Sequence, residues 1–299
     1  MYCHDWKQQQ VLSVRSLRVR EIDAAEITKT VTRLFIEANY HLTDDVLEAL
    51  QRAQDTEESP VGKEVLGQLI RNADIAAKEQ IALCQDCGAA IVFLELGQEV
   101  HITGGDLNTA INAGVREAYE TGFLRKSMVF QPFSGRVNTQ DNTPAIIYTD
   151  IVPGDKLKII VAPKGGGAEN MSRLIMLTPS AGRQGIIDRV VKAIDEAGSN
   201  PCPPIIVGVG IGGTAEKTML MAKKALLRKI GLHNADPEVT KLENELFRRI
   251  NELGIGPMGY GGRITALAVN IEVFPAHIAS MPVAVNINCH SSRHKEAII

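Results

Sequence analysis

Cysteines offer the most distinctive chemistry in this sequence, and two of them lie in the segment Cys84-Gln85-Asp86-Cys87-Gly88. A C-x-x-C pair fits half of a zinc site, a redox-active dithiol, or one or two ligands of an iron–sulfur cluster. No second C-x-x-C pair follows to complete a four-cysteine zinc site. A thioredoxin-type pair would begin a helix that follows a strand, whereas this pair precedes a predicted strand.

Cys202 and Cys289 each stand alone at a predicted junction between a strand and a loop. Cys202 lies in Asn200-Pro201-Cys202-Pro203-Pro204, where the prolines restrict the backbone to a non-helical turn. Cys289 ends another predicted strand. Such junctions can converge on one edge of a sheet, and three thiolates are what a [4Fe–4S] cluster with one open iron requires. The alternative is three unrelated buried cysteines, since cysteine is often buried.

Two glycine-rich segments follow predicted strands. In Lys164–Asn170, consecutive glycines would let backbone N–H groups approach an anion such as a carboxylate, or would form a flexible surface turn. Val207–Thr214 is typical of a tight strand-to-helix turn. It does not match the G-x-G-x-x-G dinucleotide fingerprint, and no acidic residue follows at the expected distance. Nicotinamide binding is therefore disfavoured.

Composition restricts the class of protein. The 299 residues are 44% hydrophobic and 22% charged, as in ordinary globular proteins. A net charge of −3 argues against nucleic-acid binding, and no apolar run is long enough to span a membrane. Five widely spaced cysteines and no recognisable signal peptide favour a reducing, cytoplasmic location. Residues 1–20 are basic, and we expect them to form a disordered extension.

Periodicity and capping signals predict a mixed α/β (α+β) fold. Its helical N-terminal segment would precede one or more mixed β-sheets flanked by helices, in a single domain over residues 21–299. Predicted helices begin after Asp23, Thr43, Ser59 and Asp106, cover 186–197 and 214–229, and begin again at Asp236-Pro237. Predicted strands cover 89–96, 145–152, 156–162, 204–209, 265–274 and 281–288. Their order within a sheet does not follow from the sequence.

Taken together, these motifs resemble the class I fumarase and L-tartrate dehydratase family, alpha-type chain. The resemblance extends from Arg20 to about Arg293. Five segments carry it in the expected order: Cys84-Gln85-Asp86, Gly165-Gly166-Gly167, Asn200–Pro204 with the glycine turn after it, Leu253–Pro257, and the final cysteine. Each motif alone is weak, whereas their order is specific.

The resemblance implies a cofactor and a set of site residues. Family members hold a [4Fe–4S] cluster through three cysteines, which correspond to Cys84, Cys202 and Cys289. Asp86 and His277 correspond to catalytic residues, with Asp86 expected to take part in proton transfer. Gln85, Arg125 and Gly166 correspond to substrate contacts. A guanidinium such as that of Arg125 suits a substrate carboxylate.

Cys87 departs from the family pattern, in which threonine is frequent at this position. It is a bystander, an alternative ligand, or a disulfide partner of Cys84 when the cluster is lost; we favour Cys84 as the ligand. Nothing in the sequence matches the family's beta-type domain, so we expect a separate beta subunit to complete the active site. His277 is expected to reach a neighbouring subunit, which implies an alpha–alpha dimer.

The expected activity is that of an alpha subunit in a two-subunit, iron–sulfur-dependent hydro-lyase. The expected reaction is the reversible hydration of fumarate, a small dicarboxylate, to L-malate. One alternative is an L-tartrate dehydratase alpha subunit. Another is a non-catalytic module that binds a metal or cluster and regulates a partner.

Overall fold

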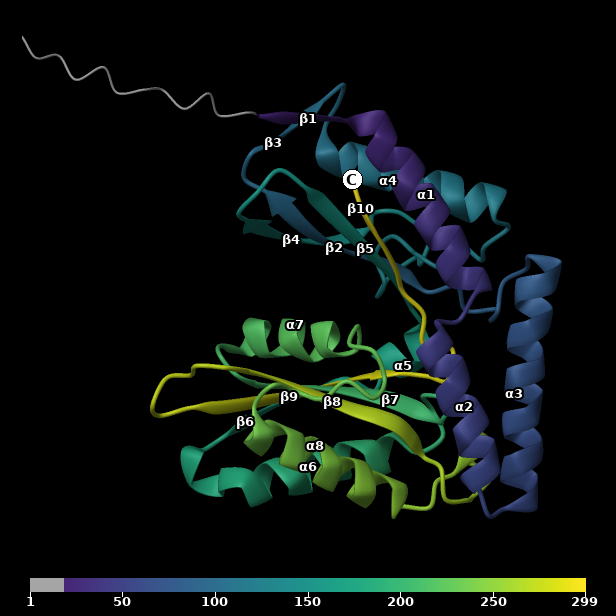
Figure 1. Ribbon diagram of the computed structural model, residues 1–299, viewed down its shortest axis with the longest axis vertical. Helices are drawn as coiled ribbons and strands as arrows, with labels where there is room; N and C mark the ends of the chain where they lie inside the picture. The colour runs from purple at the N-terminus through teal and green to yellow at the C-terminus, as the bar shows by residue number, and fades with distance from the viewer. Residues whose placement is uncertain (1–18) are drawn as a thin grey trace, which may run out of the picture.

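The computed structural model describes residues 19–299 and contains two β-sheets with separate hydrophobic cores, joined by helices (Figure 1). The predicted mixed α/β fold is confirmed. The basic segment, residues 1–20, is expected to be disordered. Residues 1–18 of it lie outside the described part of the chain. Among the described residues, no helix is long and apolar enough to cross a lipid bilayer.

The predicted helical N-terminal segment is present as α1 (Ala24–Tyr40), α2 (Asp44–Thr56) and α3 (Pro60–Glu79). Asp23 caps α1 by accepting a hydrogen bond from the Ala25 N–H at 2.7 Å. Ser59 caps α3 in the same way, with Pro60 at the first helical position. Thr43 precedes α2, but its side chain makes no capping hydrogen bond. Helix α1 lies over the first sheet, whereas α2 and α3 lie beside the second (Figure 1).

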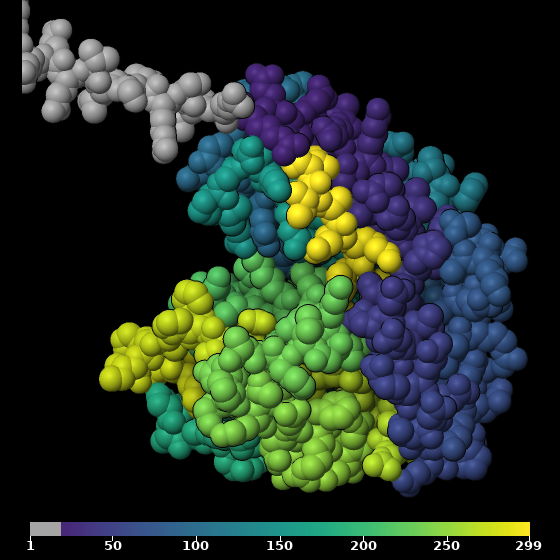
Figure 2. Space-filling view, in the orientation of Figure 1, coloured from purple at the N-terminus to yellow at the C-terminus, as the bar shows by residue number. Residues whose placement is uncertain are grey.

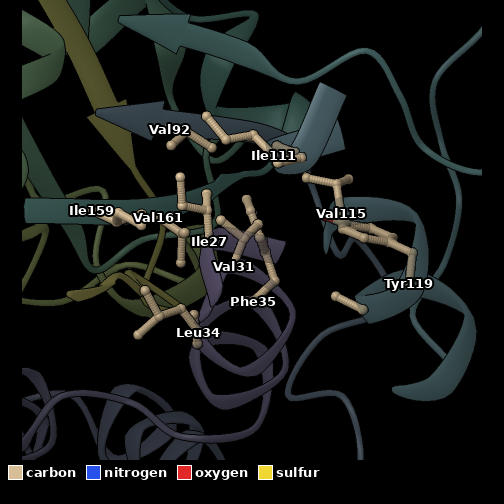
Figure 3. Close-up of a cluster of buried hydrophobic side chains, with 14 of the residues drawn as sticks. Ile27, Val31, Leu34, Phe35, Val92, Ile111, Val115, Tyr119, Ile159 and Val161 are labelled. Atoms are coloured by element: carbon tan, nitrogen blue, oxygen red, sulfur yellow. The ribbon is translucent and has the colours of Figure 1, made fainter. Parts of the chain in front are cut away.

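The first sheet has the strand order β10 (Lys295–Ile298), β5 (Leu157–Lys164), β2 (Ala89–Gly97) and β4 (Ile146–Val152). Strands β2 and β4 are parallel, and the other pairs are antiparallel. Helices α1 and α4 (Leu107–Thr121) pack on one face, where Ile27, Phe35 and Val92 belong to the core shown in Figure 3. The short strands β1 (Arg20–Asp23) and β3 (Val100–Thr103) pair beside it.

The second sheet has the strand order β6 (Arg173–Leu177), β9 (Met281–Asn288), β7 (Ile205–Gly212) and β8 (Ala266–Phe274). Helix α7 (Ala215–Ala225) covers one face, and α6 (Gly182–Ala197) and α8 (Pro237–Asn251) cover the other (Figure 1). A Cβ atom on Gly208 or Gly210 would lie 2.1 Å from a backbone oxygen of α7. These glycines therefore allow α7 to pack directly on β7.

The buried carboxylate of Glu57 attaches the turn between α2 and α3 to the loop that precedes β8 of the second sheet. Glu57 is 1% exposed and accepts hydrogen bonds from the backbone N–H groups of Glu58, Ser59, Arg263 and Ile264 at 2.8–2.9 Å. Burial raises the pKa of Glu57, but these four bonds outweigh it and the net pKa is lowered. The charged form of Glu57 thus joins two segments about 200 residues apart.

Candidate functional site

Two of the three predicted ligand cysteines lie at the same end of the second sheet. Cys202 precedes β7 and Cys289 follows β9, and these strands are antiparallel neighbours with Ile206 opposite Asn288. The His290 N–H donates to the Cys202 carbonyl at 3.3 Å. Sheet topology thus brings the two cysteines together, as the strand–loop junctions predicted.

Cys84 approaches this pair from the loop between α3 and β2. Burial raises the pKa of the Cys202 thiol, and the neighbouring thiols of Cys289 and Cys84 raise it further. Burial also raises the pKa of Cys289, which the Arg293 guanidinium partly offsets. Cys84, Cys202 and Cys289 are free and only partly buried. The three thiols are therefore close enough to influence one another electrostatically.

The backbone at Cys202 is held in an unusual conformation. Its φ of 54° lies in the left-handed region, which typically costs a non-glycine residue about 1–2 kcal/mol. The Cys202 N–H donates to the Ser199 carbonyl at 3.0 Å, which helps to hold the turn. Such strain is concentrated at functional sites, where the surrounding structure maintains it.

Three free thiols are the kind of donor that an iron–sulfur cluster takes. Among residues 19–299, no three His, Cys, Asp or Glu side chains are gathered as ligands of one ion. A [4Fe–4S] cluster is larger, and each thiolate binds a different iron, so its ligands need not converge on one point. The buried Arg293, with two N–H-bearing atoms that lack partners, adds a positive charge suited to an anionic cluster.

Asp86 connects the cysteine loop with the glycine-rich segment. Its Oδ1 accepts a hydrogen bond from the Gly88 N–H at 3.0 Å, and its Oδ2 accepts one from the Gly166 N–H at 2.7 Å. In the segment after Lys164, residues Gly166–Glu169 form the single-turn helix α5. The Gly166 N–H does point at a carboxylate, that of Asp86.

A cavity of about 420 Å³ contains four of the predicted site residues: Gln85, Asp86, Arg125 and Gly166. Two larger hollows, of about 840 and 760 Å³, lie beside α2, α3 and α8 and contain no predicted site residue. The cavity near the cysteines is therefore the better candidate for a substrate site, although the roles of its residues stay predictions.

Cys87 lies behind this cavity, within the first core. Its side chain is 1% exposed, and its Sγ accepts a hydrogen bond from the Arg125 N–H at 3.1 Å. The Tyr119 hydroxyl donates to the carbonyl of Cys87 at 2.8 Å. This environment favours a structural role for Cys87, which supports the Arg125 backbone. Cys84 is therefore better placed than Cys87 to bind a cluster.

Sequence reasoning missed a buried charge network at the cavity wall. Lys164, 5% exposed, donates to the Ile287 carbonyl at 2.7 Å and lies 3.3 Å from Glu169. Glu169 also pairs with Lys223 at 2.6 Å and accepts a hydrogen bond from Asn286 at 2.9 Å. Burial lowers the pKa of Lys164 to about 8. Burial opposes ionisation of Glu169, but the two lysines lower its pKa to about 2.

His277 is remote from the cysteines of its own chain. It lies in the exposed segment between β8 and β9, which projects from the molecule in Figure 2. Gly212 pairs with Phe274 at that end of the sheet, whereas Cys202 and Cys289 lie at the other. At about 3.3 Å per residue, the length of β7 separates them by more than ~20 Å. His277 therefore does not reach the cysteines of its own chain.

Comparison with known proteins identifies the family. A model of the fumarate hydratase (fumerase) family matches residues 28–298. A Methanocaldococcus jannaschii protein named "Putative L(+)-tartrate dehydratase subunit alpha" is 45% identical over 273 residues, 90% of this chain and 95% of the relative. The L(+)-tartrate dehydratase subunit alpha of Escherichia coli strain UTI89 is 32% identical over 271 residues, 90% and 89% of the two chains.

The match covers almost the whole described chain, including both sheets and the cysteine loops. The chain belongs to the fumarate hydratase family, and the predicted resemblance is confirmed. It is accordingly a hydro-lyase, an enzyme that adds water to a carbon–carbon double bond or removes it.

Proposed function

We propose that this chain is the alpha subunit of a two-subunit, [4Fe–4S]-dependent hydro-lyase that reversibly hydrates fumarate to L-malate. The main support is the cavity that contains Gln85, Asp86, Arg125 and Gly166 beside three free cysteines. We assign the cluster to Cys84, Cys202 and Cys289, and the substrate to the cavity. Free thiols at all four described cysteines fit a reducing cytoplasm.

Substrate binding begins with the carboxylates. Arg125 offers a guanidinium for one of them, and Gln85 offers an amide that can orient the other polar groups. The Gly166 N–H, now bonded to Asp86, is placed to donate to an anion that enters the cavity. When bound, the cluster supplies a Lewis acid through its open iron.

Hydration also needs a group that transfers a proton at the carbon next to the new hydroxyl. Asp86 and Glu169 are the two carboxylates that line the cavity. Glu169 is committed to Lys164, Lys223 and Asn286, and its pKa of about 2 keeps it ionised. Asp86 is therefore the better candidate for holding and releasing the proton.

A dicarboxylate requires more positive charge than the described residues lining the cavity offer. Of the two cations lining the cavity, Arg125 and Lys164, the lysine is already bonded to Ile287 and Glu169. The relatives are named as alpha subunits, which implies a beta subunit. We propose that the beta subunit supplies the further cations. A second alpha chain would supply His277, which makes the assembly contain an alpha–alpha dimer.

L-tartrate dehydration is the second candidate. It is favoured by the names of the relatives, including the one that is 45% identical. Tartrate carries a second hydroxyl, so discrimination depends on whether the cavity satisfies that hydroxyl. A non-catalytic cluster-binding module is the third candidate and would show no turnover.

The test is anaerobic reconstitution with iron and sulfide, followed by addition of the beta subunit. We expect about four irons and four sulfides per chain, as the proposed [4Fe–4S] cluster requires, and then turnover of fumarate in preference to tartrate by kcat/KM. Cys202→Ser and Cys289→Ser should abolish turnover, whereas Cys87→Ser should retain the cluster. Preference for tartrate would establish the second candidate, and a cluster without turnover would establish the third. Full activity in either ligand variant would refute the ligand assignment.

A further inference from the structure

Arg293 is a buried cation without a buried counter-ion. It follows β9 by five residues, and its side chain is 3% exposed. Its Nη2 donates to the backbone carbonyl of Asp86, while Nε and Nη1 have no hydrogen-bond partner within residues 19–299. Among the described residues, no carboxylate lies within ion-pair distance of this guanidinium. Both oxygens of the nearby Asp86 accept hydrogen bonds elsewhere, from Gly88 and Gly166.

Such an arrangement is costly for the chain by itself. A guanidinium loses its hydration when buried and normally recovers the loss through a paired anion and a full set of hydrogen bonds. Two other cations have a carboxylate partner: the buried Lys164 pairs with Glu169, and the partly buried Arg228 pairs with Glu243 at 2.6 Å. Arg293 is the exception, so its environment is suited to an anion that the polypeptide does not provide.

The position of Arg293 indicates which anion this is. Its guanidinium donates to the backbone carbonyl of Asp86, two residues after Cys84, and Arg293 itself follows Cys289 by four residues. It does not line the cavity of Arg125, so it is not directed at a substrate carboxylate. The guanidinium therefore acts on the cysteine side of Asp86, where thiolates and inorganic sulfide would collect negative charge.

We propose that Arg293 is a positioning residue for the cluster, donating from Nε and Nη1 to its sulfur atoms and neutralising part of its negative charge. This inference rests on the proposed cluster site. Hydrogen bonds to sulfur and nearby positive charge raise the reduction potential of a cluster and help to retain it. The same residue also holds the Asp86 carbonyl, so it couples the cluster site to the proposed proton-transfer group.

The experiment compares the wild-type full chain with Arg293→Met and Arg293→Lys after anaerobic reconstitution. We measure the midpoint potential of the cluster by an EPR-monitored titration, and the rate of iron release to a chelator. Arg293→Met should shift the potential to more negative values and accelerate iron release by about 10–100-fold, the range typical of outer-shell partners of a metal site. Arg293→Lys should restore the potential partly, because it keeps the charge but not the planar donors.

Thermal unfolding separates this role from a merely structural one. Removing a buried charge without a counter-ion should leave the melting temperature of the cluster-free chain unchanged or higher, and should lower that of the reconstituted chain. Arg228→Met is the control, since it removes a partly buried arginine that is paired with Glu243. It should destabilise both forms equally and leave the potential unchanged.

The results that overturn the inference differ from those that overturn the proposed function. If the wild-type chain takes up no cluster, the proposed function fails, and with it the assignment of Arg293. If the wild-type chain is loaded but Arg293→Met has the wild-type potential and iron-release rate, only the role of Arg293 fails. Equal destabilisation of the loaded and cluster-free chains by Arg293→Met would show that the residue serves the fold alone.

Discussion

The two sheets of this protein are protected to different degrees. The second sheet is covered on both faces, and seven of the eight residues of β7 are buried. The first sheet is packed on one face by α1 and α4, whereas β4 has no buried residue and its Ile151 is 73% exposed. The second sheet thus provides a fixed base for Cys202 and Cys289, and the first leaves a surface available to other chains.

We call the first sheet with α1 and α4 the first half, and the second sheet with α6, α7 and α8 the second half. The candidate site lies where the two halves meet. Cys84, Asp86 and Arg125 come from the loops of the first half, and two cysteines come from the second. Lys164 of β5 crosses the boundary to the Ile287 carbonyl of β9. Relative placement of the halves therefore decides the geometry of the site, and substitutions should differ in effect according to the half they affect.

The largest effect on folding is expected from Gly210→Ala in the second sheet. The new Cβ would lie 2.1 Å from the backbone oxygen of Thr218 in α7, which cannot move alone. We expect a loss of about 3 kcal/mol in the free energy of unfolding, measured by urea denaturation. Gly105→Ala, beside the first sheet, is the control: its Cβ would meet only the Ala24 methyl at 3.2 Å. Equal losses would contradict the proposed difference between the halves.

Lys164→Met tests the contact between the two halves, which Lys164 of β5 makes with β9. It removes the hydrogen bond to Ile287 and one ion pair of Glu169, and we expect a loss of about 2 kcal/mol in unfolding free energy. Lys192→Met in α6 is the control, since its 3.7 Å pair with Glu196 is exposed. That control should change stability by less than about 0.5 kcal/mol. A similarly small change for Lys164→Met would mean that the halves are held together elsewhere.

Glu57 gives a pH-dependent test of the link between α2, α3 and the second half. Its pKa is lowered in the folded chain, so its contribution is complete above the unfolded value of about 4.5 and is lost as pH falls below it. Glu57→Gln should cost about 2 kcal/mol at pH 7. Its stability should also fall less steeply than that of the wild type between about pH 5 and pH 3. If the unfolding free energies of the wild type and Glu57→Gln change in parallel with pH, Glu57 is not the origin of the pH dependence.

The smallest effect is expected at the surface of the first half. Phe133, 89% exposed, lies in the loop after Arg125, and replacing it with serine removes almost no buried area. The free energy of unfolding should change by less than about 0.5 kcal/mol in urea denaturation. A larger loss would show that this loop packs against the first sheet in solution and that the surface is less available than described.

Much of the fold follows from local signals. Asp23, Ser59 and Asp106 were predicted to begin helices and do so, because caps and apolar periodicity act within one turn of chain. The sequence analysis missed the strands β1, β3, β6 and β10. All four are short, and their pairing depends on partners far away in sequence: β10 pairs with β5, more than 130 residues earlier. Strand order cannot be derived from local pattern alone.

The sequence predicted the site residues of distinctive type, such as the cysteines, but not the lysine and the arginine that are buried beside them. Cysteines and glycine runs are conspicuous, and the structure brings Cys84, Cys202 and Cys289 together. Lys164 and Arg293 were missed because lysine and arginine are almost always exposed. Their burial results from neighbours over 100 residues away, such as Ile287 and Asp86. A cation directly before three glycines, or four residues after a cysteine, would have been the available signal.

Cys289 lies on the crossing from β9 of the second sheet to β10 of the first, and this position has a consequence for biosynthesis. A chain emerging from the ribosome exposes Cys84 and Cys202 long before Cys289, which is about 200 residues beyond Cys84. The proposed ligand set is complete only after β9 has joined the second sheet and β10 has joined the first. Loading of the proposed cluster would then follow translation.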